Sequence, residues 1–402
     1  MIGAGTMGRG IAMAFANGGL PVTLMDKDPA QLDRALEAIA GDYRAAVEKG
    51  RLGNDEAARR LGLIRRAGGY EAVADADLVI EAVFEEMSIK QEVFRELDRI
   101  CKPEAILASN TSSLDLNRIA GFTSRPERVI GLHFFAPANI MRLLEIVRGG
   151  QTSDEVLKTG LELSRRLGNT GVVVGVCYGF VGNRMFLPYL REAELMMLEG
   201  VPPERIDAVA VDWGMAMGPH AVTDLSGLDV FQRLNAANPA RPDDPAWFRV
   251  CDLLCEAGRY GQKSGAGIYR YQGRRPQPDP EVTELVRQEA ERLGIPRREI
   301  DDSEILERLL LPMINEGALI LEEGIAIRSG DIDVIYTNGY GFPRHRGGPM
   351  FHADQQGLEK VLAGIERYRQ RYGDRYWRPA PLLERLAREG SSFSAWSRAS
   401  GA

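Results

Sequence analysis

The sequence predicts an α/β domain followed by two related all-α domains. Three observations support this. Apolar runs alternate with helical patterns over residues 1–175, the rhythm of a parallel sheet with crossover helices. After Gly182 strand patterns almost disappear, and apolar residues recur at helical spacing. Finally, residues 301–396 repeat features of residues 176–272.

The elements expected in the first domain are short apolar strands and long polar helices. Strands are expected at 20–26, 76–84, 105–110, 128–135, 143–147 and 170–175. A stretch rich in Ala, Glu and Arg predicts a helix from Ala30 to Arg66, broken near Gly50–Gly53. A second helix is expected over Ser88–Ile100.

The C-terminal repeat is sparse but ordered. FLPYLREAELMMLEGV (186–201) aligns with LLPMINEGALILEEGI (310–325) at an offset of 124. The echoes further along are Arg205-Ile206-Asp207 with Asp331-Ile332-Asp333, and Met217-Gly218-Pro219 with Gly347-Gly348-Pro349. Two unrelated amphipathic helices are the alternative, but the shared order favours duplication. We expect helical copies at 176–272 and 301–396. A linker at 273–300, whose first part is the Pro-rich stretch 272–280, is expected to join them.

Composition and charge narrow the classes of protein. The 402 residues are 44% hydrophobic and 27% charged, as in globular proteins, and the net charge of −7 gives no general reason to expect a nucleic-acid surface. No apolar run approaches the roughly 18 residues of a membrane span. The four cysteines are scattered, so we expect buried thiols, no metal site and a reducing, cytoplasmic location.

A glycine-rich turn opens the chain. Gly3, Gly5 and Gly8 fit the pattern G-x-G-x-x-G, with Thr6 and Met7 at the start of the next helix. The first glycine permits a tight turn, the second lets a pyrophosphate approach the backbone, and the third allows the helix to pack on a strand. Free N–H groups at the helix start favour phosphates. Because glycine turns are common, the motif alone is weak evidence for a dinucleotide.

Asp26 strengthens this interpretation. It ends the apolar run Val22–Met25, 18 residues after Gly8. A carboxylate there can accept hydrogen bonds from both adenosine ribose hydroxyls and would repel a 2′-phosphate, which favours NAD over NADP. Alternatively, Asp26 is a solvated residue at a strand end. The central strand that should precede the turn is almost absent, so we expect a truncated chain or a damaged sheet.

A histidine and a glutamate form the second candidate site. His133 ends the apolar strand VIGLHFF, and Glu145 lies on the strand that returns after Pro137. In such a pair the carboxylate fixes the imidazole tautomer, while the other ring nitrogen takes a proton. Beside NAD, this base suggests hydride transfer from a secondary alcohol. A structural ion pair is the alternative.

Several segments in fixed order resemble 3-hydroxyacyl-CoA dehydrogenases. They are IGAGTMGRGIA (2–12), SNTSSL (109–114), LHFFAPANIMRLLEIV (132–147), YGFVGNRMFLPYL (178–190), GQKSGAGIYRY (261–271) and NGYGFPRHRGGPMF (338–351). The resemblance covers nearly the whole chain and is greatest to the dehydrogenase part of peroxisomal bifunctional enzymes and bacterial multienzymes, without their hydratase domain. It implies a Rossmann-type NAD-binding domain and the oxidation of L-3-hydroxyacyl-CoA to 3-ketoacyl-CoA in fatty-acid β-oxidation.

The resemblance also implies roles for single residues. His133 matches the catalytic base and Glu145 its orienting partner. Ser112 matches a serine near the substrate oxygen and the cofactor, and Asn183 an asparagine that polarises the reacting oxygen. The charged residues matched by position are Glu85, Lys90 and Lys263 as cofactor contacts and Lys49 as a contact to CoA phosphate. For each of these four, the alternative is a solvated surface charge.

Departures from the family pattern carry further expectations. Ala136 replaces a polar residue, which costs about 1 kcal/mol if one hydrogen bond is lost. Glu307 stands at the position equivalent to Asn183, so the second copy is expected to be architectural. His345 is expected to belong to loop structure rather than to contact CoA phosphate.

The resemblance and the duplication suggest how the chain is organised. We expect a monomer in which the two helical copies pack as an internal pseudo-dimer, with possible association with other β-oxidation enzymes. If the chain is complete, it should not hydrate enoyl-CoA. The final Ser-Gly-Ala is no peroxisomal address, which favours the cytoplasm.

Two rival functions stay open at this point. One is another two-domain NAD-dependent hydroxyacid or sugar-acid dehydrogenase, a class that commonly uses a lysine of the helical domain as base. The other is a non-catalytic or truncated NAD-binding relative. The acyl-chain length is not predictable, because it depends on packing.

Overall fold

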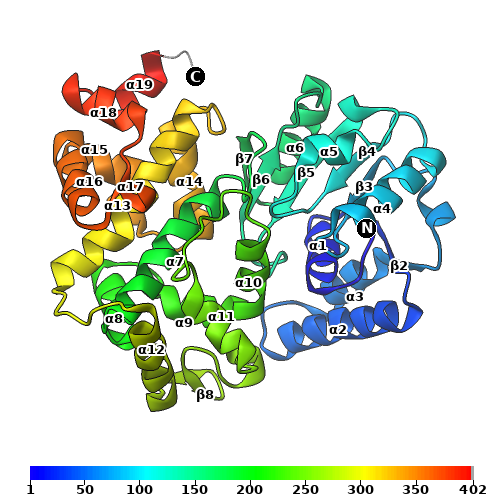
Figure 1. Ribbon diagram of the computed structural model, residues 1–402. Helices are drawn as coiled ribbons and strands as arrows, with labels where there is room; N and C mark the ends of the chain where they lie inside the picture. The colour runs from blue at the N-terminus through cyan, green and yellow to red at the C-terminus, as the bar shows by residue number, and fades with distance from the viewer. Residues whose placement is uncertain (400–402) are drawn as a thin grey trace. The chain divides into compact units, whose positions relative to one another are not determined.

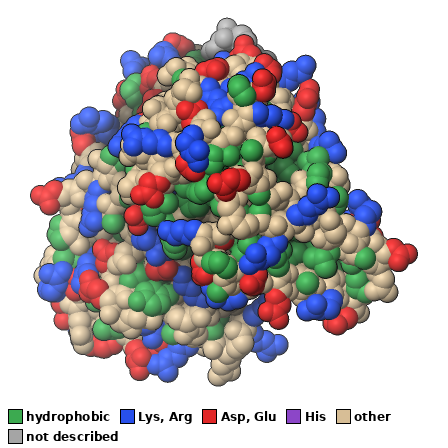
Figure 2. Space-filling model, turned by 90° about the vertical axis from the view of Figure 1, so that its right-hand side faces the viewer, with side chains coloured by type: hydrophobic (Ala, Val, Ile, Leu, Met, Phe, Trp, Pro, Cys, Tyr) green, Lys and Arg blue, Asp and Glu red, His purple; other side chains and the backbone are tan. Residues whose placement is uncertain are grey.

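The computed structural model describes residues 1–399 and divides them into two compact units (Figure 1). The first unit is Met1–Phe180, and the second begins at Val181. No helix in the described residues has the length and apolar character needed to cross a bilayer. Figure 2 shows acidic and basic side chains interspersed over the face drawn, in keeping with the modest net charge of −7.

The first unit is built on a mixed sheet. Its strands are β1 (Val22–Met25), β2 (Ile64–Ala67), β3 (Leu78–Glu81), β4 (Ile106–Ser109), β5 (Val129–Phe134), β6 (Leu143–Val147) and β7 (Thr170–Val174). β1 pairs with β2, and β3 to β7 follow one another in order. All neighbours are parallel except β5 and β6. The β5–β6 pair is the one departure from the parallel order indicated by the sequence, because residues 135–142 are too few for a crossover helix and return the chain antiparallel.

Residues 1–3 take the central position of this sheet. Ile2 forms parallel bridges to both Met25 and Glu81, so it connects β1 with β3. Its N–H donates to the Ile80 carbonyl and its carbonyl accepts from Ala82 N–H, both at 2.8 Å. Backbone pairing therefore crosses the sheet at this point, although the central segment amounts to a single bridge.

Helices and 3₁₀ turns cover the sheet. They are α1 (Thr6–Asn17), α2 (Pro29–Glu48), α3 (Asn54–Gly62), η1 (Tyr70–Val73), α4 (Met87–Ile100), α5 (Leu116–Ala120), η2 (Pro126–Arg128) and α6 (Asp154–Arg166). Ile11 of α1 and Ile39 of α2 join Leu24 and Leu132 of the strands in one apolar core.

The helix predicted from Ala30 to Arg66 breaks near Gly50–Gly53, as expected, but its last residues are wrong. They belong to β2, which pairs with β1. Only the two ends of β2 are buried, whereas Arg65 and Arg66 are exposed. Because two of its four residues are arginines, this strand has no apolar run or clear alternation that would identify it.

The second unit is almost entirely helical. Its elements are α7 (Gly182–Leu198), α8 (Pro203–Trp213), α9 (Pro219–Ser226), α10 (Leu228–Ala236), α11 (Arg249–Glu256), η3 (Gln262–Ser264), β8 (Arg270–Gln272), β9 (Arg275–Gln277), α12 (Pro280–Leu293), α13 (Asp302–Glu322), α14 (Ser329–Gly339), η4 (Arg344–Arg346), α15 (Pro349–Gln356), α16 (Leu358–Tyr372), α17 (Asp374–Trp377), α18 (Pro381–Arg388) and α19 (Phe393–Ala399). His345 lies in η4, between two helices.

The segment expected as a linker, 273–300, is structured. β9 pairs with β8 as a hairpin, and α12 follows at once. Asp279 caps this helix by accepting from Glu281 N–H, and Pro280 is its first residue. The helix buries Val282, Val286 and Ala290 on one face. Asp-Pro marks a helix start, but the preceding prolines made the whole stretch resemble an extended connection.

One set of hydrogen bonds explains why an Asp and a Gly-Pro pair recur in both helical copies. Asp207 of α8 accepts from the N–H groups of His220 and Ala221 at 2.9 Å, in the first turn of α9. Asp333 of α14 accepts in the same way from Met350 and Phe351 in α15. First-turn N–H groups have no intrahelical partner, so each carboxylate satisfies donors that would otherwise be buried without one.

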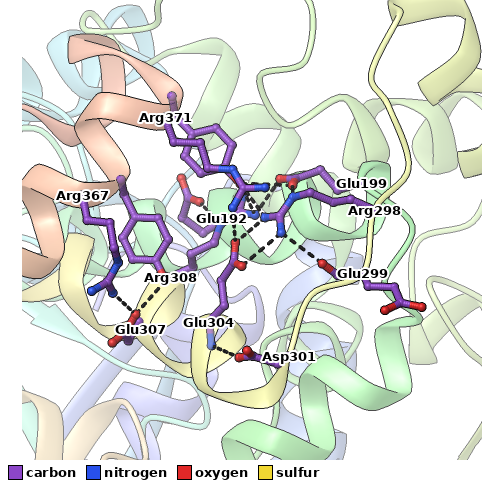
Figure 3. A network of polar contacts seen from close by, with 12 residues as sticks. Glu192, Glu199, Arg298, Glu299, Asp301, Glu304, Glu307, Arg308, Arg367 and Arg371 are labelled. Carbon is purple, nitrogen blue, oxygen red and sulfur yellow. Dashed lines mark hydrogen bonds and ion pairs between the residues drawn. The ribbon is translucent and has the colours of Figure 1, made fainter.

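A buried ion cluster joins the two long helices α7 and α13 (Figure 3). Arg308 of α13 donates to Glu192 of α7 at 2.8 Å and to Glu199 at 2.6 Å. The Arg308 side chain is 1% exposed and that of Glu192 0%. Arg298 and the Tyr372 hydroxyl also contact Glu199. A guanidinium without these partners would be buried and uncompensated.

A second ion cluster, built from the equivalent residues of the repeat, lies at the other end of the same helix pair. Arg184 of α7 donates to Glu316 of α13 at 2.7 Å and to Glu323, the C-cap residue of α13, at 2.5 Å. Arg184 precedes Arg308 by the repeat offset of 124 positions. Glu316 and Glu323 follow Glu192 and Glu199 by the same offset. Such an exchange of partners between α7 and α13 is the pattern of a two-fold interface.

The two clusters predict different costs for one substitution. Arg308→Met should lower the free energy of unfolding by up to about 3–5 kcal/mol, because it removes a buried guanidinium from Glu192 and Glu199 and leaves Glu192 with only Arg191 as its ionic partner. Arg184→Met removes the equivalent arginine of the more exposed cluster, in which the Glu323 side chain is 45% exposed. It should lower the free energy of unfolding by roughly 1 kcal/mol or less. Urea denaturation of both variants tests this, and equal losses would contradict it.

Candidate active site

The glycine turn has the geometry that a dinucleotide needs. Gly3 has φ +91°, and a Cβ on Gly8 would lie 1.9 Å from the Gly3 carbonyl oxygen, so both positions require glycine. Gly5 is the N-cap of α1, no side chain caps this helix, and a Cβ on Gly5 would meet only open space. Thr6 and Met7 form the first turn. The helix start therefore presents its N–H groups to an anion, which fits a pyrophosphate.

Asp26 lies against this turn. Its Oδ2 accepts from Ala4 N–H at 2.7 Å and its Oδ1 from Asp28 N–H at 3.0 Å. The carboxylate is thus fixed beside the phosphate-binding turn while staying partly exposed. This is the place expected of a group that reads the adenosine ribose.

His133 and Glu145 face each other across the antiparallel strands β5 and β6. They are direct cross-strand partners, and His133 Nδ1 lies 2.8 Å from Glu145 Oε2. His133 is 6% exposed and Glu145 0%. With Nδ1 on the carboxylate, Nε2 is the nitrogen that can take a proton from a substrate. The short return between the strands therefore places a histidine and a carboxylate directly opposite each other, an arrangement that can serve as a general base and its orienting group.

Two aromatic rings that sequence reasoning missed stand beside the imidazole. The ring centroids of Phe135 and Phe180 lie 4.3 and 5.7 Å from that of His133. Phe180 is fully buried at φ +49°, a strained conformation for a bulky residue. Both belong to motifs that identified the family resemblance, HFF and YGF, so the signal was present in the sequence.

Glu85 holds the loop that carries Ser112. It accepts from Thr111 Oγ1 at 2.6 Å, from Ser112 N–H at 2.7 Å and from Ser112 Oγ at 3.3 Å. Burial alone would raise the pKa of Glu85, but Lys90 and these hydrogen bonds outweigh it and lower the pKa. The carboxylate therefore stays ionised and fixes the loop through three acceptor contacts.

Lys90 is buried beneath this loop rather than exposed. Its side chain is 1% exposed, and its Nζ lies 2.8 Å from Glu81 and 3.4 Å from Glu85. Ser109 also donates to Glu81. The alternative of a solvated surface charge is wrong for Lys90. Glu81 and Ser109, which the sequence did not single out, complete a polar cluster at the ends of β3 and β4.

Three predicted residues lie on helices or turns other than those that carry these clusters. Lys49 is exposed at the end of α2, in the first unit. Asn183 and Lys263 belong to the second unit. Asn183, the second residue of α7, accepts from the Tyr340 hydroxyl at 2.8 Å. Lys263 is half-exposed and pairs with Asp229.

Comparison with family models decides the relationship. The model of the 3-hydroxyacyl-CoA dehydrogenase NAD binding domain matches residues 1–177, and the model of the C-terminal domain matches 179–271 and again 305–395. The chain belongs to the 3-hydroxyacyl-CoA dehydrogenase family. Its first unit is the family's NAD-binding domain, and the two matches of one model confirm the predicted pair of related helical domains.

Individual relatives agree with the family. The chain is 42% identical over 408 residues to the peroxisomal bifunctional enzyme of Danio rerio, covering 97% of this chain and 56% of that protein. It therefore spans about half the length of the curated relatives it matches. The solved 3-hydroxybutyryl-CoA dehydrogenase of Escherichia coli aligns with TM-score 0.84 and 28% identity, over 97% of this chain and 98% of that one. The dehydrogenase part of multifunctional enzyme 1 from C. elegans aligns with TM-score 0.68 and 30% identity, over 96% and 88%.

Within residues 1–399, no group of His, Cys, Asp and Glu side chains has the arrangement of a metal site. Three of the four cysteines are buried, and Cys177 is half-buried. The candidate site consists of the glycine turn, the His133–Glu145 pair and the Ser112 loop.

The position of Asp26 predicts cofactor preference. Asp26→Ala should raise KM for NAD about ten-fold or more, the equivalent of some 1.4 kcal/mol, and should narrow the discrimination against NADP. Asp28→Ala is the matched control, because it removes the N-cap of α2 in the same loop and should cost about 1 kcal/mol of stability without changing the preference. An unchanged NAD to NADP ratio in Asp26→Ala would contradict ribose binding by this residue.

Proposed function

We propose that the protein oxidises L-3-hydroxyacyl-CoA to 3-ketoacyl-CoA with NAD as hydride acceptor, as a dehydrogenase of fatty-acid β-oxidation. The observation that carries the proposal is the buried His133–Glu145 pair on the NAD-binding domain, with 2.8 Å between its polar atoms. A base of this type matches the one proton that oxidation of a secondary alcohol releases.

The chemistry follows from the pair. As the secondary alcohol is oxidised to a ketone, its C3–O bond becomes a carbonyl and its hydroxyl proton passes to His133 Nε2. Glu145, on Nδ1, stabilises the imidazolium that forms. The bound NAD supplies the hydride acceptor. A positioned general base of this kind contributes about 10²–10⁴-fold to the rate.

The other site residues take supporting roles in the proposal. Ser112, held by Glu85, donates to the substrate oxygen, and Asn183 polarises the same oxygen. Lys90 acts by keeping Glu85 ionised under the Ser112 loop.

Two surface lysines are proposed as contacts to phosphate groups. Lys49 is proposed to contact a CoA phosphate, and Lys263 is proposed to contact the cofactor. Exposure of the two ammonium groups supports both assignments, although Lys263 already pairs with Asp229.

One rival has support among the solved structures. The solved structure of a diketoreductase that acts on dicarbonyl compounds aligns with TM-score 0.61 and 27% identity, over 67% of this chain and 97% of that one. Offering acetoacetyl-CoA with NADH separates the two functions. Rapid NADH consumption supports the thioester substrate, whereas turnover of simple dicarbonyl compounds alone supports the rival. A non-catalytic relative would consume no NADH with either.

We further propose a monomer that acts in the cytoplasm and associates with other β-oxidation enzymes. The reciprocal ion clusters of α7 and α13 support the monomer, because they satisfy within one chain an interface of two-fold type. The names of several relatives place those proteins in peroxisomes or glyoxysomes, so compartment is a point on which this chain is proposed to differ.

Loss of the base should abolish turnover without loss of cofactor binding. His133→Gln is expected to reduce kcat with acetoacetyl-CoA and NADH by about 10²–10⁴-fold, while the Kd for NADH stays nearly unchanged. His352→Gln, a histidine of α15 in the second unit, serves as the control and should keep wild-type kcat. Comparable turnover in His133→Gln would remove the proposed mechanism.

A further inference from the structure

The second helical copy reaches a residue of the first copy that matters for the reaction. Tyr340 follows α14, and its hydroxyl donates to Asn183 Oδ1 at 2.8 Å. The position equivalent to Asn183 in the second copy, Glu307, instead accepts from Tyr368 and pairs with Arg367. The contact between Tyr340 and Asn183 is therefore not an element of the repeat but a one-way contribution from the second copy.

The Tyr340 ring is closely fitted to the start of α7. A Cβ on Gly182 would lie 2.4 Å from the ring and from its hydroxyl oxygen, so only glycine allows this approach. The ring stacks on Tyr336 at 4.9 Å and lies 5.3 Å from Phe186, measured between centroids. The Tyr336 hydroxyl donates to the Gly182 carbonyl at 3.1 Å. Gly182 and Asn183 are thus fixed by two tyrosines of the second copy.

The loop after Tyr340 is anchored as well. The carbonyl of Gly341, at φ +68°, accepts from Ala216 N–H of the first copy at 2.9 Å. Phe342 N–H returns to the Tyr336 carbonyl at 3.2 Å. With its ring stacked and its backbone held on both sides, the phenol has little freedom to leave Asn183.

The chemistry of this hydrogen bond orients the amide. An asparagine side chain can turn its oxygen or its nitrogen toward a given partner, and the two differ in function. A hydroxyl that donates to Oδ1 holds the oxygen at Tyr340, so the N–H donors of Nδ2 point along the other branch. A donor is what a developing or reacting oxygen requires.

We infer that Tyr340 is a positioning residue for the dehydrogenase reaction: it fixes the Asn183 amide so that Nδ2 donates to the substrate oxygen. This inference rests on the role of Asn183 in the proposed function. It also gives the second helical copy a part in catalysis, in place of the purely architectural one expected from sequence.

The test uses Tyr340→Phe, which keeps the ring and removes only the hydroxyl. With acetoacetyl-CoA and NADH, kcat should fall roughly ten-fold, because a mispositioned group costs rate, while the Kd for NADH and the melting temperature stay close to wild type. Tyr376→Phe is the matched control. Its hydroxyl also joins the second copy to the first, through Asp244, and its loss should leave kcat unchanged.

A double-mutant cycle with Asn183→Ala decides how Tyr340 acts. Asn183→Ala alone should lower kcat, and adding Tyr340→Phe should lower it no further, since the hydroxyl then has no amide to orient. Wild-type kcat in Tyr340→Phe, or a full additional loss in the double variant, would overturn the inference alone. Wild-type kcat in Asn183→Ala would overturn both the inference and the proposed role of Asn183. If His133→Gln were the variant without effect, the proposed function itself would fail.

Discussion

A buried imidazole held by a buried carboxylate is the interaction on which the proposed chemistry depends. A charged Glu145 has no water to solvate it, so its stability requires a partner, and the β5–β6 register supplies His133 directly opposite. The antiparallel return that breaks the parallel order of the sheet is thus the feature that creates the base. The rest of the NAD-binding domain places a cofactor turn and a clamped serine loop on the same sheet.

The helical unit depends on a different constraint, the need to bury a duplicated helix pair that carries charge. α7 and α13 exchange arginine–glutamate clusters, and the buried one is compensated on every side by carboxylates and a phenol. Replacing either helix in isolation would leave charges without partners. The two helical copies therefore satisfy these charges between them. Tyr340 of the second copy also donates a hydrogen bond to Asn183 of the first, a contact that the repeat does not duplicate.

Sequence patterns predicted the strands better than the connections. The run LLEIV coincides with β6, because four apolar residues around a single glutamate indicate a strand that is buried on both faces. β2 was missed because its exposed arginines carry no such signal, and α12 because its prolines resembled a linker. Local sequence patterns indicate burial and turns. They fail for β2, where burial is partial, and for α12, where a proline begins a helix.

For the site, sequence predicted the identities of residues but not their environments. The pairing of His133 with Glu145 follows from two strands joined by a short return, and the structure contains it. The burial of Lys90 could not be predicted, because it depends on a contact with Glu81, a residue that belongs to no motif singled out in the sequence. The link from Tyr340 to Asn183 spans 157 positions and needs a glycine whose value is visible only in three dimensions.

The most direct measurement is a crystal structure of the protein with NADH and acetoacetyl-CoA bound together. The account predicts His133 Nε2 within about 2.6–3.2 Å of the 3-keto oxygen, with Nδ1 still on Glu145 and the nicotinamide C4 facing the same carbon. An imidazole outside hydrogen-bond reach of that oxygen, or one that has lost its carboxylate, would contradict it.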